Sequence, residues 1–426
     1  MDTPGRSATA TSILLLAVMF TLTAWTHPLS GPVSAAEGDP IIGQSTAVAV
    51  APESVTFTLS VTSDEPLARV ELLWRAAADQ QYSLVRIADL PDGDDSVEYI
   101  LDTRLNYIPP GVDVHWVWQV TDAGGDMTRS TEDTVTYLDP DEDWTIVTTA
   151  EAEVYWSDAD QSDADAIVDA VTRTLEIMQE RFDVATQRPI RVVLYRNQNT
   201  FADALPPGSA EWIGGQAHTD LDIFVAHLIP GSTSEIRRLI PHEIAHLALS
   251  QETDNPWTST PQWLDEGLAV YLQEQEDERL PEVLDDAIDD GRLIPLAALQ
   301  SAFPWDTERA LLSYAESWSV VDYLIGTYGD DGLTRLIDAV ADGETNDAAL
   351  ARAFGITLEQ LDQDWKASLD YAGDAPPAAP SSATSSDDDL NETEQAVALG
   401  VVGFGCILGL GMLIFGIIRF RQVGRR

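Results

Sequence analysis

Residues 45–140 alternate between apolar and polar positions, a pattern that predicts β-strands. The clearest runs are residues 55–61 (VTFTLSV), 70–74 (VELLW) and 114–120 (VHWVWQV). Alternation places every second side chain on one face of a strand, and turn residues at 110–111 (PG) and 122–125 (DAGG) separate the runs. About a hundred residues of this kind predict an immunoglobulin- or fibronectin-like sandwich, with Trp116 and Trp118 on one face as core residues.

Residues 145–371 combine helical and strand patterns instead. Helices are predicted over residues 163–182, 264–275, 313–328, 331–342 and 357–371, and strands over 189–195 and 222–225. A mixed order of this kind predicts an α+β domain.

Another helix of this domain is predicted to begin near Ser232. The run from Ser232 to Glu235 has the Ser-x-x-Glu form of a capping box, and apolar residues follow at helical spacing from Ile236 to Leu247. Pro241 lacks a backbone N–H, so we expect it to kink the helix or restart it just before His242.

The two ends of the chain predict export and membrane anchoring. Residues 1–36 combine a short apolar run with small residues before Ala36, as in a signal peptide; an uncleaved anchor is the alternative. Residues 372–395 are acidic and rich in Pro and Ser, which predicts an extended stalk. Residues 396–418 are 23 residues without a charge, about 34 Å as a helix, which predicts a single transmembrane helix; the alternative is a buried soluble helix.

Residues 419–426 contain four Arg and predict a short cytoplasmic tail. The expected location is therefore the cell membrane, with a single pass and with the N-terminal domains outside the cytoplasm. The formal charge of −49 repels nucleic acid and anionic lipid, so we expect no nucleic-acid partner. The single Cys, Cys406, falls in the predicted span, which leaves none to form a disulfide in the exported part.

Within the predicted helix, residues 242–246 (HEIAH) carry the chemistry of a metal site. Residues four apart lie on one face of a helix, so His242 and His246 can hold one ion, and Glu243 can take a proton from water beside it. Glu266, downstream in WLDEGL, supplies a third ligand. Catalytic zinc takes three such protein ligands and keeps one position for water. The alternative is a helix whose His and Glu only face solvent.

The two motifs HEIAH and WLDEGLAVY resemble those of the gluzincin metallopeptidases, the group of thermolysin and aminopeptidase N, and more narrowly the peptidase MA-like domains. The resemblance covers roughly residues 145–370 and implies a zincin fold and a peptide or protein substrate. It also implies Zn²⁺ held by His242, His246 and Glu266, with Glu243 as the general base.

The chain departs from the related patterns in three places. It lacks the Gly-x-Met-Glu-Asn run of aminopeptidases and has Gly214-Gly215-Gln216 in roughly that place. Thermolysin-like enzymes have an Asp four residues after the third ligand, where this chain has Val270. The residues that orient the ligand His side chains are therefore not assigned by the resemblance.

Three further residues are candidates for contact with the substrate. Gluzincins often place a Tyr or His beyond the third ligand, and Tyr314 is the candidate donor to the oxyanion; the alternative is an aromatic residue that only packs on its helix. His218 and His227 flank the predicted strand over residues 222–225. Either can touch substrate, and the alternative for both is a surface or core His.

The sequence thus predicts an α+β zincin catalytic domain over residues 145–371, an immunoglobulin- or fibronectin-like sandwich before it, and a C-terminal transmembrane helix. The expected function is that of a membrane-anchored, extracytoplasmic zinc metallopeptidase. The alternative is a non-catalytic cell-surface binding protein built on a zincin-like fold. An intramembrane protease is disfavoured because charged residues flank His242. Nothing in the sequence predicts an oligomeric state.

Overall fold

A computed structural model describes residues 39–77, 81–88, 95–158, 161–206, 214–229, 231–304, 306–371 and 373. The segments predicted as signal peptide (1–36), transmembrane helix (396–418) and cytoplasmic tail (419–426) lie outside the described residues. Of the predicted stalk, residues 372–395, only Gly373 is described.

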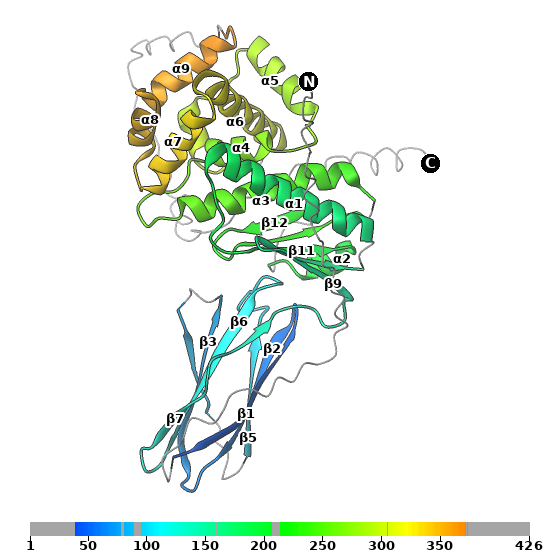
Figure 1. The fold of residues 1–426 in the computed structure, drawn as a ribbon, viewed down its shortest axis with the longest axis vertical. Coiled ribbons are helices and arrows are strands. Elements are labelled where there is room, and N and C mark those ends of the chain that lie inside the picture. Colours follow the sequence, from blue (N-terminus) through cyan, green and yellow to red (C-terminus); the bar gives the residue numbers. More distant parts are fainter. Residues whose placement is uncertain are drawn as a thin grey trace, which may run out of the picture. The chain divides into compact units, whose positions relative to one another are not determined.

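Two antiparallel sheets are formed by the described residues from 41 to 136 (Figure 1). One has the strand order β1-β2-β5 and the other β4-β3-β6-β7, with β8 paired to β6. The strands are β1 (Ile41–Val50), β2 (Ser54–Thr62), β3 (Leu67–Ala76), β4 (Ser83–Arg86), β5 (Asp95–Asp102), β6 (Asp113–Asp122), β7 (Met127–Arg129) and β8 (Asp133–Thr136). Trp116 and Trp118 are both buried, as predicted, and the Trp116 ring meets the Phe57 ring edge-on at 5.6 Å.

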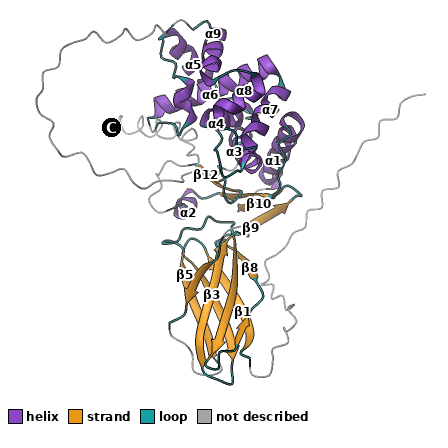
Figure 2. Ribbon diagram, turned by 90° about the vertical axis from the view of Figure 1, so that its left-hand side faces the viewer, coloured by secondary structure: helices purple, strands orange, loops and turns teal. Residues whose placement is uncertain are grey.

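A third sheet is mixed and has the strand order β12-β13-β11-β10-β9. Its strands are β9 (Trp144–Thr148), β10 (Ala152–Ser157), β11 (Ile190–Tyr195), β12 (Gly215–His218) and β13 (Ile223–His227). Strands β10, β11 and β13 are parallel, and both edge strands run antiparallel to their neighbours. One face is covered by helices because alternate residues such as Val154, Val192 and Phe224 belong to the same hydrophobic core as the helices (Figure 2).

The helices other than α2 surround that core and begin with α1 (Gln161–Phe182), whose buried stripe includes Ile167, Val171 and Met178. The others are α2 (Gln198–Asp203), α3 (Thr233–Thr253), α4 (Gln262–Tyr271), α5 (Arg279–Asp289), the 3₁₀ turn η1 (Leu296–Gln300), α6 (Thr307–Tyr328), α7 (Asp330–Ala341), α8 (Asn346–Phe354) and α9 (Leu358–Ser368). The α+β order expected of a zincin is therefore present.

Helix α3 differs from its prediction in two respects. The capping box is not formed: the side chain of Ser232 makes no capping hydrogen bond, and Glu235 pairs with Arg238 at 2.8 Å. Pro241 does not restart the helix either, because α3 continues through it from Thr233 to Thr253.

The predicted transmembrane helix over residues 396–418 has to be corrected. Within the described residues, no helix is both long enough and apolar enough to cross a membrane. The longest, α1 and α6, have 22 residues each, but charges such as Asp169 and Arg173 in α1 and Glu316 and Asp322 in α6 interrupt them. The fold class of the described residues is therefore the zincin-like α+β fold, without a transmembrane helix.

Candidate metal centre

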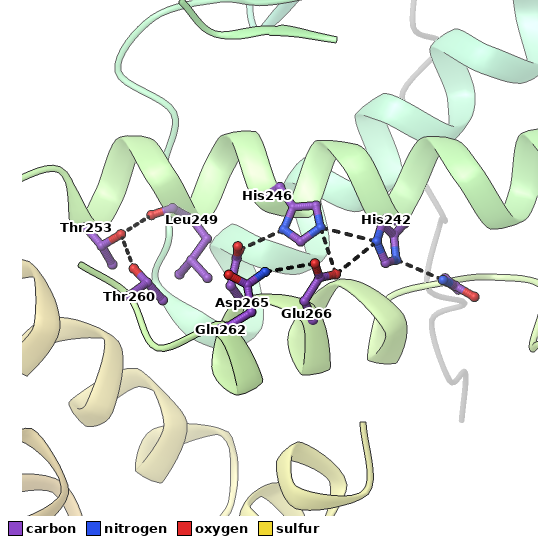
Figure 3. Close-up of polar contacts among 9 residues, drawn as sticks. His242, His246, Leu249, Thr253, Thr260, Gln262, Asp265 and Glu266 are labelled. Atoms are coloured by element: carbon purple, nitrogen blue, oxygen red, sulfur yellow. Dashed lines mark hydrogen bonds and ion pairs between the residues drawn. The ribbon is translucent and has the colours of Figure 1, made fainter. Parts of the chain in front are cut away.

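Three donor atoms from two helices converge at one point. His242 and His246 lie one turn apart on α3, and Glu266 faces them from α4 (Figure 3). The Nε2 atoms of the two His are 3.2 Å apart, and Oε2 of Glu266 lies 3.5 Å from the first and 3.3 Å from the second. All three side chains are buried, and the described residues contain no other such group of His, Cys, Asp and Glu.

These spacings can be compared with those around a metal ion. A tetrahedral zinc ion with bonds of about 2.0–2.1 Å has its ligand atoms roughly 3.3 Å apart. The three measured separations of 3.2, 3.3 and 3.5 Å fit that figure. Two nitrogens and one carboxylate oxygen also suit zinc, whereas Ca²⁺ and Mg²⁺ prefer oxygen ligands alone. The residues present therefore fit a tetrahedral metal ion.

The first turn of α4 holds two of the donor side chains in place. Oδ1 of Asp265 lies 2.7 Å from Nδ1 of His246, and the amide of Gln262 donates to Oε1 of Glu266 at 2.9 Å. Burial raises the pKa of Glu266, but His246 and His242 outweigh it, so the net pKa lies below the usual value. Asp265 was not among the predicted site residues, although its position directly before Glu266 was a usable signal.

Glu243 is a fully buried carboxylate beside the three donor atoms. Neither of its oxygens has a hydrogen-bond partner among the described residues. Burial raises the pKa of Glu243 to about 8, with His246 opposing the shift and Glu266 adding to it. A buried carboxyl group without a partner is costly to the fold, so it points to a role in function.

Gly267 allows α4 to approach α6 closely at the residue after Glu266. A Cβ atom at this position would lie 2.3 Å from the carbonyl oxygen of Ser317 and 2.7 Å from a methyl group of Val321. Only glycine fits between the two helices without moving one of them. The Glu-Gly pair therefore combines a donor side chain with a close helix contact.

The remaining predicted residues lie at different distances from this centre. Tyr314 of α6 is buried, with its ring centroid 6.5 Å from that of His242 and 5.2 Å, edge-on, from that of Phe303. His218 and His227 stand at the ends of β12 and β13 and are not part of the metal group. Nε2 of His227 lies 3.1 Å from the carbonyl oxygen of Arg196.

Comparison with known proteins identifies the domain that contains this centre. Residues 170–371 match the model of the Peptidase MA superfamily. The matched segment includes His242, Glu243, His246, Glu266 and Tyr314, which confirms the predicted resemblance to the peptidase MA-like domains. A search of curated proteins gives no match.

Two solved structures are similar to this chain at low identity. One is an aminopeptidase N family protein from Idiomarina loihiensis, with 10% identity, a TM-score of 0.39, and 74% of this chain and 73% of that chain covered. The other is an aminopeptidase A from Legionella pneumophila in complex with aspartic acid, with 11% identity and a TM-score of 0.35. That match covers 78% of this chain and about half, 50%, of the other. Similarities of this size do not inform the function of the chain.

Proposed function

We propose that this protein is a zinc-dependent peptidase that hydrolyses peptide bonds in peptides or proteins. The observation that supports it is the convergence of His242, His246 and Glu266 beside the buried, unpartnered carboxyl group of Glu243. The peptidase MA domain that contains these residues agrees with this activity. The aspartate at His246 adds an acceptor that would keep the ligand nitrogen free of a proton.

Each residue of the centre has a role in the proposed reaction. His242, His246 and Glu266 would hold the metal. Zinc, when bound, supplies a Lewis acid that polarises the scissile carbonyl and lowers the pKa of a neighbouring water. Glu243 would accept the proton of the attacking water and later deliver it to the leaving amine. Tyr314 would donate a hydrogen bond to the oxygen of the substrate carbonyl as it becomes negative.

Replacing Glu243 tests the proposal in the full-length protein. The wild type should contain one equivalent of zinc by metal analysis and should cleave members of a mixed peptide library. Glu243→Gln should keep its zinc and lose at least about 10²-fold in rate, because the general base is gone. Glu252→Gln, the same change near the end of α3, is the matched control and should stay active.

Two results would contradict the proposed function. Full activity in zinc-loaded Glu243→Gln would remove Glu243 from the reaction. A wild-type protein with neither zinc nor cleavage of any library peptide would favour the binding-protein alternative.

We also propose that the domain acts outside the cytoplasm. The signal-peptide pattern of residues 1–36 supports this location. Amino-terminal sequencing of protein exported by its own leader tests it, with Glu37 as the expected first residue. An exported protein is not expected to begin at Met1. A protein that stays in the cytoplasm and still begins at Met1 would contradict the proposal.

A further inference from the structure

The proline inside α3 changes which group bonds to a backbone carbonyl. In a regular helix the N–H of residue 241 would donate to the carbonyl of Arg237, but proline has no N–H. The Arg237 carbonyl instead accepts the backbone N–H groups of Glu274 at 3.0 Å and of Gln275 at 3.3 Å. Residues 273–275, which follow α4, are therefore joined to α3 at the position that Pro241 leaves open.

The side chain of Glu274 also holds the same segment, through two ion pairs. Its two carboxylate oxygens pair with Arg173 of α1 at 2.7 Å and with Arg237 of α3 at 3.1 Å. Burial raises the pKa of Glu274, but the hydrogen bonds from the two Arg outweigh it and hold the pKa below its usual value. Residues 273–275 are thus fixed by backbone and side-chain contacts to two helices.

This anchored segment brings Gln273 to the first donor residue of the metal centre. The amide nitrogen of Gln273 lies 2.9 Å from Nδ1 of His242. The amide oxygen of Gln273 is buried and has no hydrogen-bond partner in the described part of the chain. The amide nitrogen of Gln273 therefore contacts His242, whereas its amide oxygen lacks a hydrogen-bond donor among the described residues.

The position of the proton on His242 in a metal site determines whether the oxygen or the nitrogen of the Gln273 amide must face its ring. Nε2 of His242 faces His246 and Glu266, so it is the ligand atom, and a ligand nitrogen carries no proton. Neutral His242 then carries its proton on Nδ1, which requires an acceptor. Rotating the Gln273 amide by 180° exchanges its nitrogen and oxygen in nearly the same positions. The unpartnered oxygen then accepts the Nδ1 proton.

We propose that Gln273 is the positioning residue of His242, holding its Nδ1–H through the amide oxygen. We further propose that Pro241 serves this contact by leaving the Arg237 carbonyl open to residues 273–275. The inference rests on the proposed zinc site. It also distinguishes the two ligand His: His246 has a carboxylate partner and His242 a neutral amide. A hydrogen-bonding residue four positions after Glu266, where this chain has Val270, is then not required to orient His242.

Zinc affinity in three variants of the full-length protein tests the role of Gln273. Gln273→Leu removes the acceptor and should weaken zinc binding by about 10–100-fold in competition with a chelator. Gln273→Glu keeps an acceptor at the same place and should bind zinc at least as tightly as wild type. Gln275→Leu is the matched control, since it makes the same change two residues along, where the side-chain amide donates a hydrogen bond to the carbonyl of Glu276 at 3.5 Å and not to a residue of the metal centre.

A spectroscopic measurement separates positioning from a general loss of structure. In zinc-loaded protein with ¹⁵N-labelled His, the Nδ1–H of His242 should be seen as a slowly exchanging proton in the wild type and in Gln275→Leu. Gln273→Leu should expose that proton to rapid exchange while the metal-free variant keeps the wild-type circular dichroism. Wild-type zinc affinity in Gln273→Leu, with the same slow proton, would overturn this inference alone. A wild type that binds no zinc would overturn the proposed function and this inference together.

The part assigned to Pro241 has its own test. Pro241→Ala restores an N–H that competes for the Arg237 carbonyl, so amide exchange at Glu274 and Gln275 should become faster. Zinc affinity should fall, by less than in Gln273→Leu, because Glu274 still pairs with Arg173 and Arg237. Unchanged exchange at both amides would overturn the link from Pro241 to Gln273.

Discussion

Oδ1 of Asp265 lies 2.7 Å from Nδ1 of His246, and Asp265 directly precedes Glu266 on α4. One short helix thus supplies Glu266 as a candidate metal ligand and Asp265 as the hydrogen-bond acceptor that orients His246. An acceptor at Nδ1 keeps the proton there, fixes the ring and makes Nε2 a better ligand. The relative placement of α3 and α4 therefore determines both the position and the protonation of His246.

Replacing Asp265 should weaken the metal site without removing a ligand. We expect Asp265→Ala to lower zinc affinity by about 10–100-fold, measured by competition with a chelator. Asp265→Asn keeps a hydrogen-bonding oxygen and should lose less. Asp285→Ala, at an exposed position of α5, is the control and should bind zinc normally. Equal affinity in Asp265→Ala and the control would show that the 2.7 Å contact does not support His246.

Gly267→Ala should disturb the metal centre through the helix contact. The added methyl group would meet the Ser317 carbonyl at 2.3 Å, so α4 or α6 has to move next to Glu266. We expect unfolding in denaturant to show a loss of about 1–3 kcal/mol, or more, together with weaker zinc binding.

The matched control for this change is Gly326→Ala. Gly326 is an exposed residue of α6, and a Cβ atom there meets nothing within 4 Å. Alanine favours a helix over glycine by up to about 1 kcal/mol, so this variant should be as stable as wild type or more so. If both variants gained stability, α4 and α6 would not be in close contact at Gly267.

The site could be predicted from sequence to the extent that it depends on local spacing. His242, Glu243 and His246 share a helix, and a spacing of four residues places the two His on one face whatever surrounds them. Glu266 lies on a different helix and was assigned through its motif; the structure brings its Oε2 within 3.5 Å of both His. Asp265 and Gln273 were not predicted, because they contact residues 19 and 31 positions away through helix packing.

Several helix boundaries also depend on contacts that a local pattern does not contain. Glu235 fits a capping box with Ser232, but in the structure Arg238 takes its carboxylate, so the box is not formed. Helix α5 was not predicted, although Leu280, Leu284 and Ala287 form a buried stripe at helical spacing. The alternating strands that precede the peptidase domain were easier to predict, since their period of two directly reports burial on one side.

Tyr314→Phe separates the two interpretations of Tyr314. The change removes the hydroxyl but keeps the ring that packs edge-on against Phe303. If the hydroxyl donates to the substrate oxyanion, kcat should fall by about 10²–10³-fold with KM and zinc content nearly unchanged. Wild-type kcat would show that Tyr314 only packs. Phe303→Leu tests the ring contact separately and should alter stability more than kcat.

Glu316 is a buried carboxyl group of α6 that is not part of the metal centre. It is fully buried, and its two oxygens accept the backbone N–H of Ile294 at 2.9 and 3.1 Å. Burial raises the pKa of Glu316 to about 8, although the Ile294 hydrogen bond and Lys366 oppose the shift. The folded protein therefore binds this proton more tightly than the unfolded chain, where the usual value of 4.5 applies.

The contribution of Glu316 to the free energy of unfolding should consequently fall as the pH rises. A raised pKa in the folded state contributes stability that is fully present below about pH 4.5 and is lost as the pH rises to about 8. Glu316→Gln mimics the protonated form at every pH. In urea unfolding of metal-free protein, the variant should therefore gain on the order of 2–4 kcal/mol over wild type between pH 5 and pH 8. Glu282→Gln, an exposed change on α5, should show no such gain. A difference between Glu316→Gln and wild type that stays constant with pH would mean that Glu316 is already ionised in the folded protein at pH 5.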